Sequence, residues 1–280
     1  MRFRSLVPAF ALIAAVAAAV TVRGVAAPNP RFADNSPNAV QVDVELVLAV
    51  DISYSMDPEE QQLQREGYMA ALTSPEFMQA LRSGMNGKVA VTYFEWAGGN
   101  DQRIVMPWRL IDGPESADAV ANEISRAPYR RASRTSISGA LQFAKPLFDA
   151  SGYRGIRRVI DVSGDGPNNN GALLGPVRDE VVAAGITING LPIMLNRPNT
   201  FNQGDISNLD IYFEDCVIGG PGAFVVPIRE KSKFKEAIRT KLVLEVAGRM
   251  PEARVVPVQS NTPRVSCLIG ERQWQDRWGR

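Results

Sequence analysis

Apolar runs alternate along this chain with stretches of helical spacing. Residues 46–50 form the strongest run and contain no polar side chain, which is typical of a strand buried on both faces of a parallel sheet. Further strands are predicted at 88–96, 102–110, 158–163, 186–192 and 223–227. Helices are predicted at 58–72, 75–81, 116–127, 136–150, 173–184, 209–217 and 231–247.

This alternation predicts an α/β fold, in which helices cover both faces of one sheet. A short turn at 98–101 joins the second and third strands, so that pair is expected to be antiparallel. We therefore expect a three-layer, doubly wound, mainly parallel six-stranded sheet with one antiparallel edge strand.

The chain divides into four predicted segments. Residues 1–27 combine Arg2 and Arg4 with an apolar run and small residues at the end, which is typical of a cleaved signal peptide. An uncleaved membrane anchor is the alternative, but the apolar run is short and alanine-rich for a membrane span, which favours cleavage. After cleavage, no stable membrane insertion is expected. An exposed leader follows at 28–41, then the α/β domain at 42–248 and an extended C-terminal tail at 249–280. Export to the periplasm or to the outside of the cell is expected.

Charge and composition narrow the possible functions. The chain has 31 basic and 30 acidic residues, a net charge of +1, which gives no electrostatic argument for nucleic acid binding. It has no histidine, which excludes Ser-His-Asp catalysis and histidine-ligated zinc. Cys216 and Cys267 are either a disulfide, as an oxidising compartment favours, or two buried free thiols.

Oxygen-bearing side chains gather where strands end. Asp51, Ser53 and Ser55 follow the first strand, Thr135 opens a helix, and Asp165 follows the fourth strand. In open α/β sheets, ligands bind at the carboxyl edge of the strands, so these five residues are expected to meet. Carboxylates and hydroxyls without soft donors suit Mg²⁺ or Mn²⁺.

This arrangement resembles the metal-ion-dependent adhesion site (MIDAS) of von Willebrand factor A domains, over about residues 42–248. Four segments, at 63–68, 159–169, 185–193 and 217–224, also resemble an exported bacterial family, domain of unknown function 1194. That family is considered von Willebrand A-like.

The resemblance implies a role for each residue. Ser53, Ser55 and Thr135 would coordinate the ion through their hydroxyls, while Asp51 and Asp165 would lie nearby and hold ion-bound waters. An ion with mostly neutral ligands would then take a carboxylate oxygen from a protein partner. Asp165 is chosen over Asp161 for this role because Asp161 falls inside the predicted strand.

Two departures from the family pattern concern the rim of the site. Ser133-Arg134-Thr135 stands where Gly-Gly-Thr is common, so Arg134 either repels the ion or holds an incoming acid. Glu95, at a strand end on the same edge, is assigned to the ligand rim with Arg134, with a hydrogen-bonded surface residue as the alternative. The asparagines at 168–170 are expected to make turns.

Three functions are compatible with these residues. The leading prediction is a binding domain that captures an acidic group of a protein partner through a divalent ion. The first alternative is a metal-assisted hydrolase, disfavoured because no histidine and no second carboxylate cluster accompany the site. The second is an ion-stabilised scaffold that captures no ligand. The partner and the oligomeric state are not encoded in any recognisable pattern.

Overall fold

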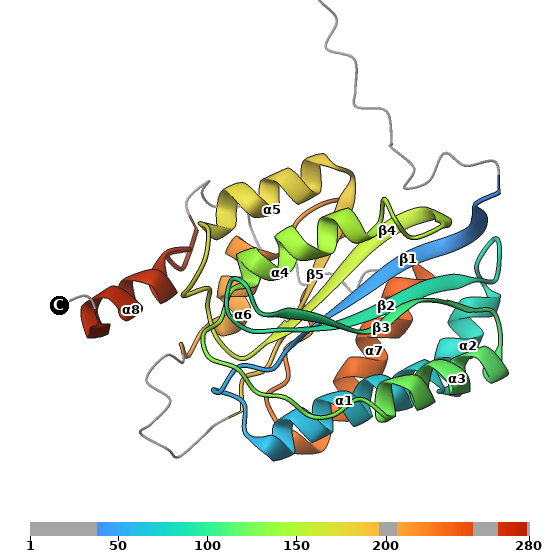
Figure 1. Ribbon diagram of the computed structural model, residues 1–280, viewed down its shortest axis with the longest axis horizontal. Helices are drawn as coiled ribbons and strands as arrows, with labels where there is room; N and C mark the ends of the chain where they lie inside the picture. Colours follow the sequence, from blue (N-terminus) through green and yellow to red (C-terminus); the bar gives the residue numbers. More distant parts are fainter. Residues whose placement is uncertain (1–37, 196–205, 249–262, 279–280) are drawn as a thin grey trace, which may run out of the picture.

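A computed structural model describes residues 38–195, 206–248 and 263–278 of the chain. Its centre is a five-stranded sheet with strand order β3-β2-β1-β4-β5 (Figure 1). The strands are β1 (Val40–Asp51), β2 (Val89–Trp96), β3 (Gln102–Ile111), β4 (Tyr153–Gly164) and β5 (Ile186–Pro192). β1 pairs in parallel with β2 and β4, β4 pairs in parallel with β5, and only β2–β3 is antiparallel. The α/β class, the mainly parallel sheet and the antiparallel edge strand are confirmed.

β1 is buried on both faces, as its apolar run predicts. Leu46 and Leu48 point into the hydrophobic core on one side, and Val47 and Ala49 point into the core on the other. Because side chains alternate along a strand, one uninterrupted apolar run supplies both cores. This places the carboxyl end of β1 at the middle of the sheet edge.

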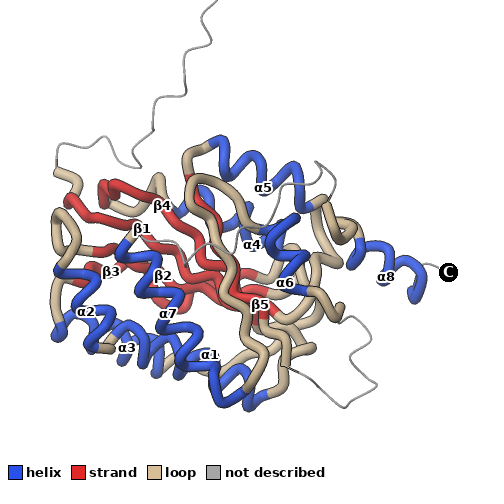
Figure 2. Tube along the Cα trace, turned by 180° about the vertical axis from the view of Figure 1, so that it is seen from behind, coloured by secondary structure: helices blue, strands red, loops and turns tan. Residues whose placement is uncertain are grey.

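Helices cover both faces. The helices are α1 (Pro58–Leu72), α2 (Pro75–Arg82), α3 (Pro114–Ser125), α4 (Ile137–Ala144), α5 (Leu174–Ala183), α6 (Leu209–Tyr212), α7 (Phe234–Ala247) and α8 (Ile269–Trp278). Residues of α1, α2, α3 and α7 share the first core, and residues of α4, α5 and α6 share the second. Figure 2 shows α2 and α7 in front of the strands, opposite the face that α4 covers. No helix within the described ranges combines the length and the apolar character needed to cross a bilayer.

The start of α1 is fixed by a capping box. Asp57 Oδ1 accepts from the Glu60 amide at 2.8 Å, and Glu60 Oε2 accepts from the Asp57 amide at 2.9 Å. Pro58 occupies the first turn, where its missing N–H costs nothing. Because Asp57 comes only two residues after Ser55, this cap limits how far the loop after β1 can move.

The predicted sixth strand is wrong. The backbone at 223–228 runs beside β5, but it forms only the isolated bridges Gly190–Val225 and Ile193–Ile228. The Val226 amide donates to the Gly190 carbonyl at 3.0 Å and the Ile228 amide to the Pro192 carbonyl at 2.9 Å. Pro192 has no N–H to donate back, so the ladder between these bridges cannot continue.

β3 is an edge strand whose pairing with β2 is irregular. Its register against β2 shifts at Tyr93, and it contains Pro107. Prolines are tolerated on edge strands because their missing N–H can face solvent.

The ends of the domain differ from the expectation. β1 begins at Val40, inside the segment assigned to the leader, and the tail is not wholly extended because it contains α8. The helix predicted at 136–150 is shorter in the structure, because α4 gives way at Pro146 to a 3₁₀ turn at Lys145–Leu147. The predicted signal peptide at 1–27 lies outside the described residues.

Candidate metal centre

The carboxyl end of β1 turns sharply at Asp51. The Ser53 amide donates to Asp51 Oδ1 at 2.7 Å, which folds the chain back on the carboxylate. Gln64 of α1 donates to the Asp51 carbonyl at 3.1 Å, and Gln61 donates to the Ile52 carbonyl at 3.3 Å. The first helix therefore holds the backbone of this turn in place.

Four of the five predicted ligands lie in direct contact. Ser53 Oγ and Ser55 Oγ are 2.7 Å apart, and Ser55 Oγ donates to Asp165 Oδ1 at 2.6 Å. The Asp165 backbone N–H in turn faces the Asp51 carboxylate. Gly164 permits this approach, because a Cβ at that position would come 3.1 Å from Asp51 Oδ2. The turn after β1 and the loop after β4 thus build one continuous set of oxygens.

Asp51 is electrostatically the most unusual of the four. It is fully buried, and its Oδ2 has no hydrogen-bond partner. Burial, and then the negative charge of Asp165, raise the pKa of Asp51 well above its ordinary value. Two adjacent buried carboxylates repel each other, so a cation placed between them would offset that repulsion.

Thr135, the fifth residue, lies on a neighbouring loop. That loop pairs with the end of β1, since the Tyr54 amide donates to the Ala132 carbonyl at 2.9 Å and the Ala132 amide to the Ile52 carbonyl at 3.1 Å. Asn169 then joins Thr135 to the loop after β4: its side chain accepts from the Thr135 amide at 2.9 Å, and its amide donates to the Thr135 carbonyl at 2.8 Å. Within the described chain, no hydrogen bond links the Thr135 hydroxyl to the other four residues.

The donor set fits a hard divalent ion. It contains two carboxylates and three hydroxyls. The described residues hold no group of three or more His, Cys, Asp or Glu side chains that could bind a metal by themselves. Sites of this composition favour Mg²⁺ or Mn²⁺ over ions that need soft or nitrogen ligands. The unpartnered Asp51 Oδ2 is the feature that a cation would satisfy.

The two residues assigned to the ligand rim have partners of their own in the structure. Glu95 is 2% exposed and forms a buried ion pair with Arg65 at 2.5 Å, so it does not stand at an exposed rim. Arg134 stacks its guanidinium on Trp274 of α8, 3.3 Å from the ring centroid. Asp161, the rejected alternative to Asp165, is buried beside Lys241.

Sequence reasoning missed the role of the three asparagines. Besides the bridge from Asn169, Asn168 Oδ1 accepts from the Ser138 amide at 3.0 Å and Asn170 Oδ1 accepts from the Gly99 amide at 2.8 Å. An amide side chain offers both donors and an acceptor, so consecutive asparagines can tie one loop to several others. The three consecutive asparagines in the sequence were the signal from which this role could have been predicted.

A pocket of about 450 Å³ opens beside the site. It is lined by Pro58, Gln61, Gln62, Tyr129, Arg130 and Arg131, and no acidic residue is among them. Arg131 connects the pocket to the site, because it donates to the Tyr54 and Met56 carbonyls at 2.7 and 2.6 Å. Both acceptors are neutral, so its positive charge is not cancelled by these contacts.

Solved structures match this fold. Proximal thread matrix protein 1 from the mussel byssus matches with a TM-score of 0.54 and 14% identity, over 74% of this chain and 49% of that chain. Another structure of the same protein, with a zinc-occupied MIDAS motif, matches with a TM-score of 0.50 and 16% identity, over 74% of this chain and 48% of that one. The pilus adhesin SpaC from Lactobacillus rhamnosus GG matches with a TM-score of 0.52 and 13% identity, over 73% and 31%. This chain thus spans about half of the mussel protein and under a third of the adhesin.

Together with the strand order, these matches define the class: the domain has the von Willebrand factor A fold. No curated protein matches the sequence. The family model described as "Protein of unknown function (DUF1194)" matches residues 41–250, and the chain belongs to that family.

Proposed function

We propose that this protein is an exported binding domain of the adhesion type, which captures an acidic group of a protein partner through a divalent ion. The observation that carries the proposal is the fully buried Asp51 carboxylate. It has one oxygen without a hydrogen-bond partner, and it lies beside Asp165 and the hydroxyls of Ser53 and Ser55. A fold used for adhesion elsewhere supports the proposal but does not replace this observation.

Ser53, Ser55, Thr135, Asp51 and Asp165 would hold the ion, which we expect to be Mg²⁺ or Mn²⁺. The ion would supply an electron-poor centre that attracts a carboxylate oxygen. Because the mussel protein carries zinc at its MIDAS motif, Zn²⁺ is a third ion to test.

An acidic partner also suits the surroundings of the site. Arg131 reaches the loop that carries Ser55. It lines the adjacent pocket together with Arg130, whose charge is offset by an ion pair with Asp101 at 3.1 Å. Positive charge next to a binding centre raises the rate at which an acidic group arrives.

Export is proposed from two features. The first 27 residues have the composition of a signal peptide. Cys216 and Cys267 form a disulfide, and disulfides persist mainly in oxidising compartments. A periplasmic or extracellular location follows from both.

Thermal unfolding with and without divalent ions tests the ion site. Mg²⁺ or Mn²⁺ added to chelator-treated protein is expected to raise the melting temperature, because an ion that binds only the folded state stabilises it. Ser53→Ala should abolish that rise. Ser125→Ala, at an exposed position on α3, is the matched control and should keep it.

Affinity capture from cell-envelope extract then tests the partner. Capture by the wild-type protein should require the ion and should be lost in Ser53→Ala. If the melting temperature rises but nothing is captured in an ion-dependent way, the protein is the ion-stabilised scaffold instead. Turnover of phosphoesters or peptides that depends on Asp51 would identify it as a hydrolase.

A further inference from the structure

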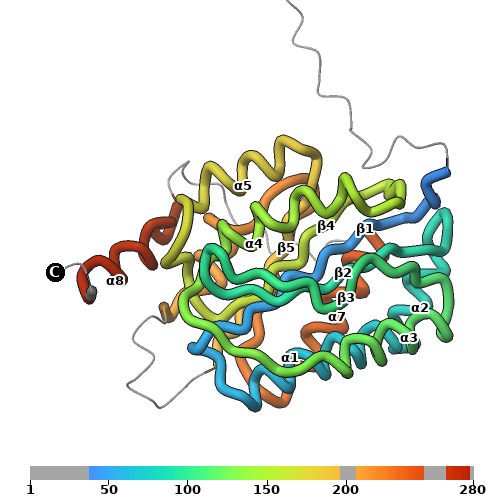
Figure 3. The backbone as a smooth tube through the Cα atoms, in the orientation of Figure 1, coloured from blue at the N-terminus to red at the C-terminus, as the bar shows by residue number. Residues whose placement is uncertain are grey.

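The C-terminal helix α8 packs against the loops that carry Asp165 and Thr135. It lies beyond the residues matched by the family model, at the end of the sheet toward which the parallel strands run (Figure 3). Gly270 touches the Asn168 carbonyl so closely that no side chain would fit there. Glu271 Oε1 accepts from Asn168 Nδ2 at 2.8 Å. A segment outside the matched domain therefore contacts the loop that carries Asp165, three residues beyond that carboxylate.

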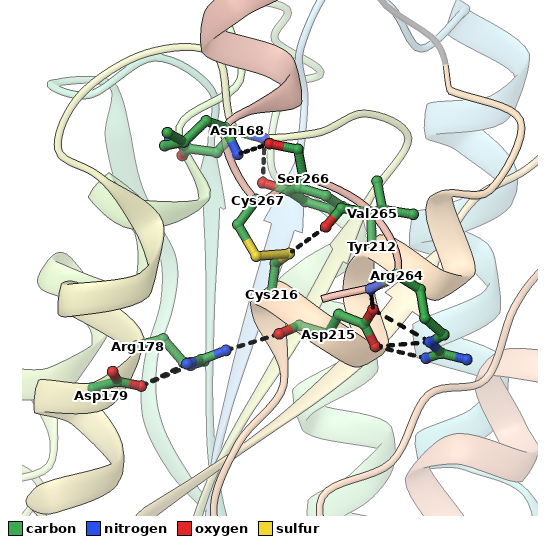
Figure 4. Close-up of a disulfide and its surroundings, with 11 residues drawn as sticks. Asn168, Arg178, Asp179, Tyr212, Asp215, Cys216, Arg264, Val265, Ser266 and Cys267 are labelled. Carbon is green, nitrogen blue, oxygen red and sulfur yellow. Dashed lines mark hydrogen bonds and ion pairs between the residues drawn. A yellow bond between two sulfur atoms is a disulfide. The ribbon is translucent and has the colours of Figure 1, made fainter. Parts of the chain in front are cut away.

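The chain holds α8 in this position by two restraints just before it. The Cys216–Cys267 disulfide ties the residue two positions before α8 to the turn after α6 (Figure 4). Arg264 forms paired hydrogen bonds with Asp215, the residue next to Cys216, at 2.6 and 3.1 Å. These restraints keep α8 beside the site loops even though its outer face is exposed.

Arg134 is the point where α8 meets the loop of Thr135. It is the only residue other than glycine with a positive φ in the described ranges, at 76°. A side chain in this left-handed region is strained, and glycine would avoid that strain. Stacking on Trp274 offsets the strain, because the negative face of an indole ring attracts a guanidinium.

The placement of this arginine matters because of its charge. Arg134 directly precedes Thr135, and a guanidinium is attracted by the same buried carboxylates, Asp51 and Asp165, that would attract a divalent ion. A long arginine side chain without a fixed partner samples many directions. In the structure, its charge is held on the Trp274 ring.

We propose that Trp274 is a positioning residue of the ion site: by binding the guanidinium of Arg134, it keeps a competing cation away from the carboxylates. This inference rests on the proposed ion site. It assigns to α8 the task of leaving Asp51 and Asp165 available to a divalent ion.

Titration calorimetry with Mn²⁺ on the full chain tests the proposal. Trp274→Ala should weaken Mn²⁺ binding by about five-fold or more, because Arg134 is released toward the carboxylates. Arg134→Gly should bind Mn²⁺ at least as well as wild type, since glycine suits the backbone and removes the charge. The double variant should return to the affinity of Arg134→Gly. Trp274→Phe, which keeps a weaker aromatic face, should lie between Trp274→Ala and wild type.

Two results would overturn the proposal. One is unchanged affinity in Trp274→Ala. The other is a double variant as weak as Trp274→Ala alone, which would mean that Trp274 acts by packing and not through Arg134. Gln275→Ala, at an exposed position on α8, is the matched control and should bind like wild type. Loss of Mn²⁺ binding in the wild type would instead contradict the ion site itself.

NMR spectroscopy of the ion-free wild-type protein tests the stacking of Arg134 on Trp274 without the need for a folded tryptophan variant. The Arg134 Nε–H resonance, assigned by its absence in Arg134→Gly, should show the upfield shift of a proton lying over an indole ring. An unshifted resonance would contradict the proposal. The melting temperature in chelator, with a thiol titration for the disulfide, establishes that each variant is folded.

Discussion

Asp51 and Asp161 are fully buried carboxylates on adjacent strands, yet only one has a cation supplied by the chain. Asp161 Oδ1 lies 2.7 Å from Lys241 Nζ, which also contacts Glu245 at 2.5 Å. Asp51 faces backbone N–H groups and a second carboxylate, and no lysine or arginine within residues 38–195, 206–248 and 263–278 forms an ion pair with it.

The difference lies in position along the strand. Asp161 sits inside β4, under α7, where Lys241 closes the cluster off from solvent. Asp51 ends β1 at the sheet edge, next to Ser55, which is partly exposed. Burial alone therefore does not distinguish a structural acid from a candidate ligand; the presence of a cation within the fold does.

The largest expected effect tests the closed cluster, which consists of Asp161, Lys241 and Glu245. Lys241→Met should destabilise the protein by about 3–5 kcal/mol at neutral pH, because it leaves Asp161 and Glu245 buried without their cation. Urea unfolding measures the loss. Lys233→Met, at an exposed site, is the control and should leave the midpoint unchanged. A small loss in Lys241→Met would show that the cluster contributes no more than a surface pair.

The pH dependence of stability also tests this cluster. Burial raises the pKa of Glu245 from its ordinary value of 4.5 to about 7, although Lys241 opposes the rise. The folded state then binds more protons than the unfolded state between these values, so stability should fall as pH rises from about 5 to about 7 and level off above, by on the order of 1–3 kcal/mol.

Glu245→Gln should reduce that fall in stability. The chain has no histidine, but the raised pKa values of Asp51, Asp161, Glu45 and Glu95 act in the same direction, so part of the fall should remain in the variant. Urea unfolding at half-unit pH steps measures both profiles. A wild-type stability that increases over this range would contradict the prediction.

The open cluster, which consists of Asp51, Ser53, Ser55 and Asp165, should gain stability when one of its charges is removed. Asp51→Asn removes one of two adjacent carboxylates, so the protein in chelator should gain on the order of 1 kcal/mol. The same change should abolish stabilisation by Mg²⁺ or Mn²⁺. Melting in chelator and in 5–10 mM ion (on the order of a saturating excess) measures both effects. A retained ion-dependent shift would show that Asp51 is not part of the site.

The smallest effect concerns how the open cluster is held. Asn169→Ala removes the side-chain acceptor of the Thr135 amide and should cost about 1 kcal/mol. Hydrogen exchange should then report a faster Thr135 amide. Asn170→Ala, which loses a bond to Gly99 instead, should leave that amide protected. Equal exchange in both variants would contradict a specific role for Asn169.

The sequence predicted what local patterns control. The apolar run of β1, the Asp57 cap and the β2–β3 turn are each encoded within a few residues, and the structure has all of them. The contact between the turn after β1 and Asp165 followed from the rule that parallel strands end at one edge.

What the sequence did not reveal depends on pairs distant along the chain. Lys241 belongs to a helix and gives no local sign that it is buried against Asp161, 80 positions away. Glu95 was placed at the rim because its partner, Arg65, lies on another element. The missing sixth strand depends on Pro192 of its neighbour, and α8 owes its position to a disulfide and to Arg264.

The two prolines at the borders of the sheet have a further consequence. Exposed strand edges offer rows of N–H and C=O groups that allow another molecule to extend the sheet, which leads to aggregation. Pro107 interrupts that row on β3, and on β5 the backbone at 223–228 already occupies the border beside Pro192. A sheet with both borders blocked in this way resists fibril-like growth from one molecule to the next.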